Sequence, residues 1–489
     1  MSTVTPEASR PLPERAADID SLLERAGRLA ARYFEEVEDR DAPVARALPP
    51  EELAQRLQLE IPAEGRSLDE LLRDAESVLQ YSVKTGHPRF FNQLFGGHDP
   101  AAVLGEWLTA LVNTSMYTYE AAPVATLMER ALIERMNRLV GFADGEGVFA
   151  PGGSISNLMA VIAARHRAFP HARQHGLQAD DRPVMFLSEE AHYSLRRAAN
   201  VIGIGLDGAV DIATDELGRM LPSALEHAIL QAKDEGRRPF LVAATAGTTV
   251  PGAFDPIEAI SHLTERHRMW LHVDASYGGT VLFSRAHRQL MEGVSQADSV
   301  AWNPHKMMGV PLACAALLLR EKGTLAATNG MNADYLFHGN DNASWDTGDM
   351  TLQCGRRVDA LKLWFSWQAL GDTGYEQRTD RLFELAGWFR EAIVDRPGFH
   401  LVREPQAANV CFRYLPDTLP PANSAERTAL EHETTVRIRE QLLAGGRFMI
   451  NYATLDGAAA FRIVLSNPAT TEADLAALLD EIEAIGSVQ

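Results

Sequence analysis

The most informative run of this 489-residue sequence is Trp302-Asn303-Pro304-His305-Lys306-Met307-Met308-Gly309-Val310. It follows the short apolar segment 299–301, which is typical of the end of a β-strand. A lysine amine held at a strand end can form a Schiff base with a carbonyl compound. The alternative is a surface lysine whose alkyl stem covers apolar neighbours. The rest of the chain has to decide between the two interpretations.

The chain around this run alternates segments typical of helices and strands. Strands are predicted at 184–187, 240–244, 270–273, 300 and 314–319, and helices at 124–140, 194–202 and 257–266. This alternation predicts βαβ units, an α/β fold and a mostly parallel central sheet. Ligands of such sheets bind beyond the carboxyl ends of the strands. Thr249, Asp274 and Lys306 each follow a predicted strand, so we expect them to meet at that edge.

The two ends of the chain have a different pattern. Residues 18–39 and 68–83 show the apolar spacing of amphipathic helices, and such a face must pack on the protein body or on a second subunit. From about residue 375, helical patterns at 381–394, 426–443 and from 471 alternate with strands at 408–414 and 461–465. We therefore predict an N-terminal helical dimerisation segment (1–100), a large ligand-binding domain (101–370) and a small C-terminal α+β domain (371–489).

Composition excludes several classes of partner. The net charge of −20 argues against nucleic acid and against an anionic membrane surface. The longest apolar run, 307–319, is too short to span a bilayer. Three cysteines cannot form a disulfide framework, and the polar stretch 1–15 lacks the apolar core of a secretory signal. These features favour a cytoplasmic protein.

A glycine-containing run, 150–157, precedes an apolar helical pattern. Backbone N–H groups at the start of a helix suit a phosphate, and the hydroxyl of Ser154, next to Gly153, adds a donor. The run is also compatible with an ordinary loop and helix cap. The sequence alone leaves both interpretations open.

Two titratable residues also follow predicted strands. Asp274 ends the run 270–274, where a carboxylate needs a partner such as a protonated pyridine nitrogen. His192 follows the strand at 184–187, where it can stack on an aromatic ring or move a proton. A structural aspartate and a surface or capping histidine are the alternatives.

The ordered set of a glycine loop, His192, Asp274 and Lys306 resembles the fold-type I (aminotransferase-like) enzymes that depend on pyridoxal 5′-phosphate (PLP). Within these it is most similar to the group II amino-acid decarboxylases, in the glutamate, cysteine sulfinate and aspartate decarboxylase branch. The resemblance extends over roughly residues 80–485. The segments that carry it are 87–94, 113–123, 245–249, 252–256, 303–306, 335–337, 346–349, 353–356, 461–462 and 466–468.

The resemblance implies a role for each matching residue. Lys306 holds PLP as an aldimine, Asp274 pairs with the pyridine nitrogen and His192 stacks on one face of the ring. The other implied cofactor-binding residues are Gly153, Ser154, Asn303 and His305 around the phosphate, Thr249 near the Asp274 end, and Ser276 on the second ring face. Ser276 departs from the alanine that is usual in the family. No metal is implied.

Tyr335 matches a catalytic tyrosine on a mobile loop of these enzymes. The resemblance implies a homodimer in which this tyrosine reaches the active site of the other subunit. There it protonates the substrate carbon of the quinonoid intermediate, which forms when CO2 leaves. An aromatic anchor in a loop is the alternative interpretation.

Three residues bear on the substrate. Arg462 matches the position that binds the distal acid, because a guanidinium suits a carboxylate or sulfinate. Gln93 matches another substrate-contacting position, and Phe95 stands where glutamate decarboxylases carry a small hydroxyl residue. The bulky ring favours a shorter acid.

We therefore expect α-decarboxylation of a short acidic amino acid, L-aspartate to β-alanine or cysteine sulfinate to hypotaurine. Decarboxylation of glutamate to 4-aminobutanoate is the first alternative. Another fold-type I reaction, such as decarboxylation-linked transamination or oxidation, and a non-catalytic PLP-binding protein are the others.

Overall fold

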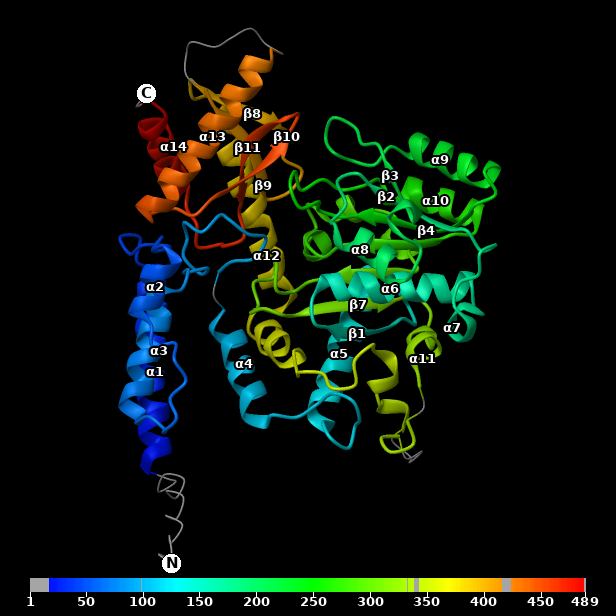
Figure 1. The fold of residues 1–489 in the computed structure, drawn as a ribbon, viewed down its shortest axis with the longest axis horizontal. Coiled ribbons are helices and arrows are strands. Elements are labelled where there is room, and N and C mark those ends of the chain that lie inside the picture. Colours follow the sequence, from blue (N-terminus) through cyan, green and yellow to red (C-terminus); the bar gives the residue numbers. More distant parts are fainter. Residues whose placement is uncertain (1–16, 98, 332, 338–342, 416–423, 488–489) are drawn as a thin grey trace, which may run out of the picture.

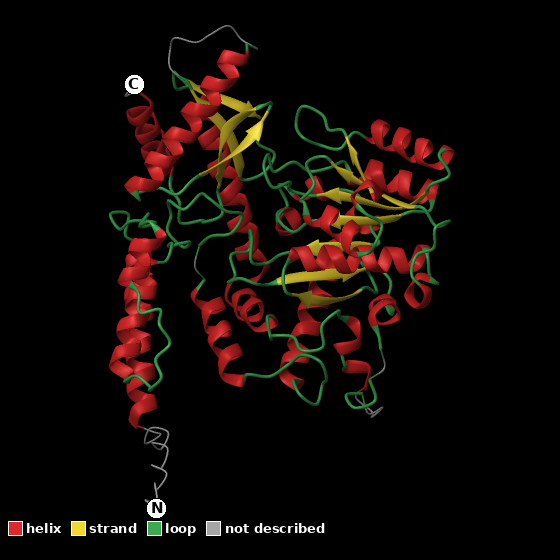
Figure 2. Ribbon diagram, in the orientation of Figure 1, coloured by secondary structure: helices red, strands yellow, loops and turns green. Residues whose placement is uncertain are grey.

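A computed structural model of the protein describes residues 17–97, 99–331, 333–337, 343–415 and 424–487. Its strands form a seven-stranded and a four-stranded sheet (Figure 1, Figure 2). The large sheet contains β1 Glu146–Ala150, β2 Pro183–Ser188, β3 Ala209–Ile212, β4 Arg238–Thr245, β5 Trp270–Asp274, β6 Ser299–Trp302 and β7 Ala315–Leu319. The small sheet contains β8 Phe399–Arg403, β9 Asn409–Tyr414, β10 Asn451–Leu455 and β11 Ala458–Val464.

Helices surround both sheets. The first seven are α1 Ala17–Glu38, α2 Pro50–Arg56, α3 Leu68–Tyr81, α4 Pro100–Val112, α5 Pro123–Val140, α6 Gly153–Ala168 and α7 Ala172–His175. The others are α8 Ser194–Val201, α9 Pro222–Asp234, α10 Ile257–His267, α11 Thr324–Asn329, α12 Ala360–Val394, α13 Ala425–Gly445 and α14 Glu472–Ser487. These bounds confirm the helices and strands that the sequence pattern predicted.

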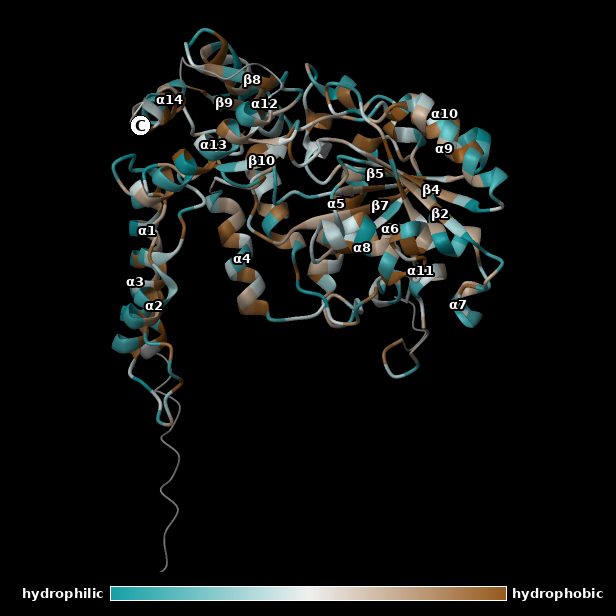
Figure 3. Ribbon diagram, turned by 45° about the horizontal axis from the view of Figure 1, so that its top comes forward, coloured by the Kyte–Doolittle hydropathy of each residue, from teal (hydrophilic) through white to brown (hydrophobic). Residues whose placement is uncertain are grey.

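The large sheet has the strand order β1-β7-β6-β5-β4-β2-β3. All neighbours pair in parallel from β3 to β6, and only β7 runs antiparallel to the strands beside it. Alternate strand residues face opposite helical layers: Met185 and Leu187 pack in the cluster with α6 and α8, whereas Val184 and Phe186 pack in the cluster with α5, α9 and α10. Figure 3 shows these central strands as hydrophobic segments. The predicted mostly parallel sheet is confirmed.

The small sheet is antiparallel, in the order β10-β11-β9-β8, and it packs against α12, α13 and α14. The long helix α12 runs from the large sheet to the small one (Figure 1) and is broken at Gly371, whose positive φ of 63° suits glycine. The carboxyl ends of the parallel strands face the small sheet, since the carbonyl of Thr249, after β4, accepts from Arg462 of β11. The domain boundaries at 100/101 and 370/371 stay predictions.

The N-terminal helices α1 and α3 pack against each other and project from the body (Figure 1). Ser67 and Glu70 form a capping box that starts α3. Side chains of α1, α3 and α4 line an apolar groove of about 630 Å³ that includes Leu29, Leu72 and Trp107. Among the described residues, no helix combines the length and the apolar character needed to cross a membrane.

Candidate active site

The glycine run forms a narrow cradle between β1 and α6. Gly152 adopts a positive φ of 124°, and α6 begins at the next residue. A Cβ on Gly153 would lie 2.5 Å from the amide nitrogen of Asn303 and 2.7 Å from the hydroxyl of Ser276. The structure thus brings together Gly153, Ser276 and Asn303, and a Cβ at position 153 would displace the two polar side chains. Ser154 occupies the first turn of α6, beside the free N–H groups.

The amide of Asn303 supports a bound phosphate in this cradle. Its Oδ1 is buried and has no hydrogen-bond partner among the described residues. The oxygen and nitrogen of an amide are interchangeable by a half turn, and the turned amide would place an N–H donor at this unpartnered position. The side chain can turn its N–H groups toward phosphate oxygens. The residues present therefore fit the phosphate end of PLP.

His305 and Lys306 lie in the connection from β6 to β7. His305 Nδ1 lies 2.6 Å from the Cys314 carbonyl oxygen and 3.1 Å from the Cys314 backbone nitrogen, and burial lowers the His305 pKa to about 4. Burial also lowers the pKa of Lys306, and the nearby Asp274 carboxylate opposes that shift. A lowered pKa increases the fraction of neutral amine, which is the form that attacks a carbonyl.

Asp274 ends β5 and is held from two sides. The backbone N–H of Ser276 donates to Oδ1 at 3.1 Å, and Asn157 Nδ2 donates to Oδ2 at 2.8 Å. Burial alone would raise the Asp274 pKa, but Lys306 and these donors outweigh it and lower the pKa. The carboxylate therefore stays ionised in a buried place, as a partner for a protonated ring nitrogen must.

His192 follows β2, and hydrogen bonds through Ser194 and Asn157 connect it to Asp274. Its Nδ1 lies 2.8 Å from the Ser194 hydroxyl, and burial lowers its pKa. The imidazole is therefore neutral near pH 7 and free to stack on an aromatic ring.

The small sheet forms one side of the site. Arg462 of β11 is only 7% exposed; its Nη1 donates to the Thr249 carbonyl at 3.3 Å and its Nη2 to the Asn92 carbonyl at 2.6 Å. The turn that carries Thr249 is tied to the strand end by Ala246, whose N–H donates to the Asp274 carbonyl at 2.9 Å. Among the described residues, Arg462 forms no ion pair with a carboxylate, so its buried charge can pair with an acidic ligand.

Two of the remaining predicted residues lie near Arg462, and the third lies away from the site. Gln93 follows Asn92 and is exposed, whereas Phe95 is partly buried with its ring 6.2 Å from that of Phe90. Tyr335 is 78% exposed in the turn 333–337, so it does not belong to the buried site of its own chain.

Sequence reasoning missed several residues that support the site. Arg378 of α12 donates to the carbonyls of Met307 at 2.8 Å and Ser466 at 3.0 Å, which ties the Lys306 connection to the small-sheet region. Asn157 and His272 form a buried hydrogen-bond network behind Asp274. His272 precedes Asp274 by two residues on β5, so both side chains face the same side of the strand. This spacing in the sequence could have identified His272 as a residue of the site.

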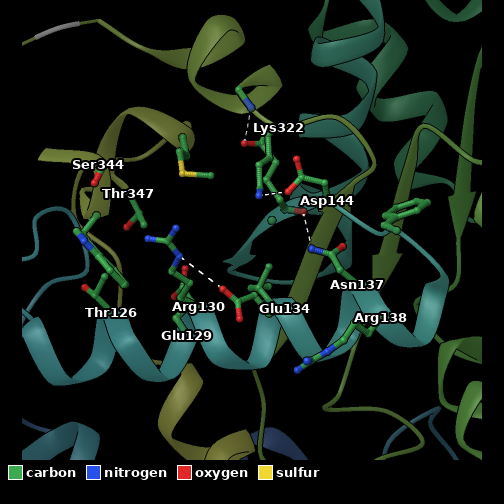
Figure 4. A pocket seen from close by; sticks show the side chains of 18 of the residues that line it. Thr126, Glu129, Arg130, Glu134, Asn137, Arg138, Asp144, Lys322, Ser344 and Thr347 are labelled. Carbon is green, nitrogen blue, oxygen red and sulfur yellow. Dashed lines mark hydrogen bonds and ion pairs between the residues drawn. The ribbon is translucent and has the colours of Figure 1, made fainter.

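A separate hollow of about 470 Å³ lies along α5, the start of β1 and residues 344–350 (Figure 4). None of the predicted site residues lines it. Four of its charged residues form two ion pairs, Arg130 with Glu134 and Lys322 with Asp144, and Arg130 also stacks 4.0 Å from the centre of the Trp345 ring. The hollow is therefore not the site at the strand ends.

The parallel sheet, the phosphate cradle, the buried carboxylate of Asp274 and the partly buried Lys306 near it together define a fold-type I PLP enzyme. Comparisons with known proteins give the family. Residues 50–415 match the pyridoxal-dependent decarboxylase conserved domain. The chain belongs to the pyridoxal-dependent decarboxylase family, and it is a PLP-dependent carboxy-lyase of group II.

Individual relatives are similar over nearly the whole chain. The cysteine sulfinic acid decarboxylase of Mus musculus is 46% identical over 442 residues, covering 89% of this chain and 90% of the relative. The Homo sapiens protein of the same name is 46% identical over 445 residues, with the same two coverages. A crystal structure of mouse CSAD superposes with a TM-score of 0.94 at 43% identity, over 97% of this chain and 100% of that one.

Proposed function

We propose that this decarboxylase converts cysteine sulfinate to hypotaurine and CO2. The observation that carries the proposal is the buried guanidinium of Arg462 beside the Thr249 turn, without a carboxylate partner among the described residues. A sulfinate or carboxylate at the end of a short side chain suits this guanidinium. The relatives at 46% identity are named for cysteine sulfinic acid, which supports the same substrate.

Bound PLP supplies a conjugated ring that takes up the electron pair of the broken bond between Cα and the carboxylate. Lys306 would bind the cofactor carbonyl, and the ionised Asp274 would keep the ring nitrogen protonated. Gly153, Ser154 and Asn303 would hold the phosphate, and His192 and Ser276 would lie against the ring. By binding the distal acid, Arg462 would fix the orientation of the substrate for loss of CO2.

Phe95 supports a short substrate. Its partly buried ring lies on the same segment as Asn92, whose carbonyl binds Arg462. Glutamate has one methylene more than aspartate or cysteine sulfinate, and one methylene changes discrimination by roughly 1–3 kcal/mol. Aspartate has the same length as cysteine sulfinate, so it is the second candidate substrate, with β-alanine as its product.

Two exposed features support a homodimer. The apolar groove between α1 and α3 includes Leu22 and Leu71, which are 37% and 53% exposed. A second copy of the chain would cover this apolar surface. Tyr335, which is 78% exposed, would then donate a proton to the substrate Cα in the other subunit. Three free cysteines, two of them buried, support a reducing location such as the cytoplasm.

The test is a comparison of CO2 release and amine product from cysteine sulfinate, aspartate and glutamate, with PLP-loaded protein. We expect the highest kcat/KM for cysteine sulfinate, with hypotaurine formed in equal amount to CO2. A higher kcat/KM for glutamate would contradict the proposal. An oxo acid product in place of the amine would contradict the decarboxylation itself.

A further inference from the structure

We propose that a buried chain of hydrogen bonds, directed from Trp270 through Ser299, His272 and Asn157, orients the Asp274 carboxylate and sets the tautomer of His192. The proposal rests on the proposed function and deepens it, because it concerns how the protein orients Asp274, the partner of the cofactor ring nitrogen. These are positioning residues, since none of the four belongs to the set that meets the cofactor.

The series of hydrogen bonds is continuous and joins side chains of β5, β6 and α6. Trp270 Nε1 lies 2.8 Å from Ser299 Oγ, which lies 2.9 Å from His272 Nδ1. His272 Nε2 lies 3.0 Å from Asn157 Oδ1, and Asn157 Nδ2 lies 2.8 Å from Asp274 Oδ2. All five side chains are at most 4% exposed, so water does not compete for these bonds.

The direction of the bonds follows from the Asp274 end. An ionised carboxylate can only accept, so the Asn157 amide faces Asp274 with its nitrogen and faces His272 with its oxygen. The His272 proton then lies on Nε2, where it donates to Asn157 Oδ1, and Nδ1 accepts. Ser299 therefore donates its hydrogen to His272 Nδ1, and it accepts from the indole N–H of Trp270, which can only donate. Burial lowers the His272 pKa to about 4, which agrees with a neutral ring that carries one proton.

Asn157 also starts a branch toward His192. Its Nδ2 lies 3.0 Å from the Ser194 hydroxyl, which lies 2.8 Å from His192 Nδ1. The backbone N–H of Ser194 also points at Nδ1, at 3.3 Å. Because Ser194 accepts from Asn157, its hydrogen is free to donate to His192. The His192 proton then lies on Nε2, which is the nitrogen not used by Ser194.

The consequence concerns the ionised state of the site. Each Asp274 oxygen receives an N–H donor, from Ser276 at 3.1 Å and from Asn157 at 2.8 Å. A carboxylate that accepts such donors stays ionised and cannot rotate freely. This series of hydrogen bonds from Trp270 to Asp274, called the relay below, thus holds the Asp274 carboxylate in place for a protonated ring nitrogen. Its residues lie on three different elements.

The experiment compares PLP with 1-deaza-PLP, in which a carbon replaces the ring nitrogen. Ser299→Ala disconnects Trp270 and leaves His272 Nδ1 without its donor, while Ser299→Thr keeps a hydroxyl. We expect the Kd of Ser299→Ala for PLP to rise on the order of tenfold, because one bond of the relay is lost. Its Kd for 1-deaza-PLP should change less than twofold, and Ser299→Thr should restore PLP binding.

The matched control is Ser261→Ala. Ser261 is another buried serine, whose hydroxyl donates within α10 to the Glu258 carbonyl at 2.7 Å, so its loss should leave both Kd values unchanged. If Ser299→Ala raised the Kd for PLP and for 1-deaza-PLP equally, Ser299 would contribute only to packing, and the proposal would be overturned. An unchanged PLP Kd would also overturn it. Failure of the wild-type protein to bind PLP would instead contradict the proposed function, so the two failures are distinguishable.

The His192 branch has its own measurement. Ring-nitrogen chemical shifts of 15N-labelled histidine distinguish the two tautomers, and His192→Gln identifies the signals of this residue. We expect a protonated Nε2 in the wild-type protein and a mixture of tautomers in Ser194→Ala. A protonated Nδ1 in the wild-type protein would overturn the branch.

Discussion

Replacing Arg462 by glutamine should separate substrate recognition from cofactor binding. The guanidinium now binds the Thr249 and Asn92 carbonyls through one N–H of each terminal nitrogen, and its Nε is buried without a hydrogen-bond partner among the described residues. Donors therefore remain for the acidic end of a substrate. Glutamine keeps a neutral amide for the carbonyls but loses the charge.

The size of the effect follows from these bonds. A hydrogen bond to a charged group is worth roughly 1.5–3 kcal/mol, and a guanidinium can offer two to one sulfinate. Two such bonds, taken at the lower bound, give about 3 kcal/mol, or roughly a hundredfold in kcat/KM. The loss should appear for cysteine sulfinate and aspartate alike, because both present an acid at the same distance.

The assay measures CO2 release against substrate concentration, together with the Kd for PLP. Arg439→Gln is the control, since Arg439 of α13 donates to the Ile450 carbonyl at 3.4 Å, outside the site. We expect the control to keep its activity and Arg462→Gln to keep its PLP affinity. A kcat/KM within threefold of wild type in Arg462→Gln would refute the assignment of this residue to the substrate acid.

Three further predictions follow from the same site. Phe95→Ser should raise the kcat/KM ratio of glutamate to cysteine sulfinate by about tenfold, as one methylene allows; an unchanged ratio removes Phe95 from substrate selection. Tyr335→Phe should lower decarboxylation at least tenfold and raise the share of oxo acid product, measured by chromatography, because proton donation to Cα is lost; an unchanged product ratio contradicts its role. Acidification from pH 6.5 to 4 should lower the free energy of unfolding, because His305, whose folded pKa is about 4, binds its proton first in the unfolded chain; denaturant titration of His305→Gln should show a shallower pH dependence, and an equal slope contradicts it.

Local patterns predicted much of the fold. The strand β5 and the helix α5 are recognisable because their apolar residues repeat with the period of the element. The antiparallel direction of β7 could not be predicted in this way. It depends on the path of the connection between β6 and β7, which no local pattern encodes. Short elements such as β3, with four residues, give too little pattern to be recognised.

The candidate site shows the same division. Lys306, Asp274 and Gly153 were predictable because each stands at a strand end or a helix start, where the chemistry of one residue is informative. The bond from His272 to Asn157 was not predictable, because it joins residues 115 positions apart. The proposed role of Tyr335 requires a second subunit, and no pattern within one chain encodes a contact between subunits.

The central claim is that Lys306 carries the cofactor, and covalent trapping tests it most directly. Borohydride reduces the C=N bond between lysine and PLP to a stable amine, and peptide mass spectrometry then locates the phosphopyridoxyl group. We predict one label per chain, on the peptide that contains Lys306. A label on Lys84 or Lys362, which are more buried than Lys306, or no label on PLP-loaded protein, would contradict it.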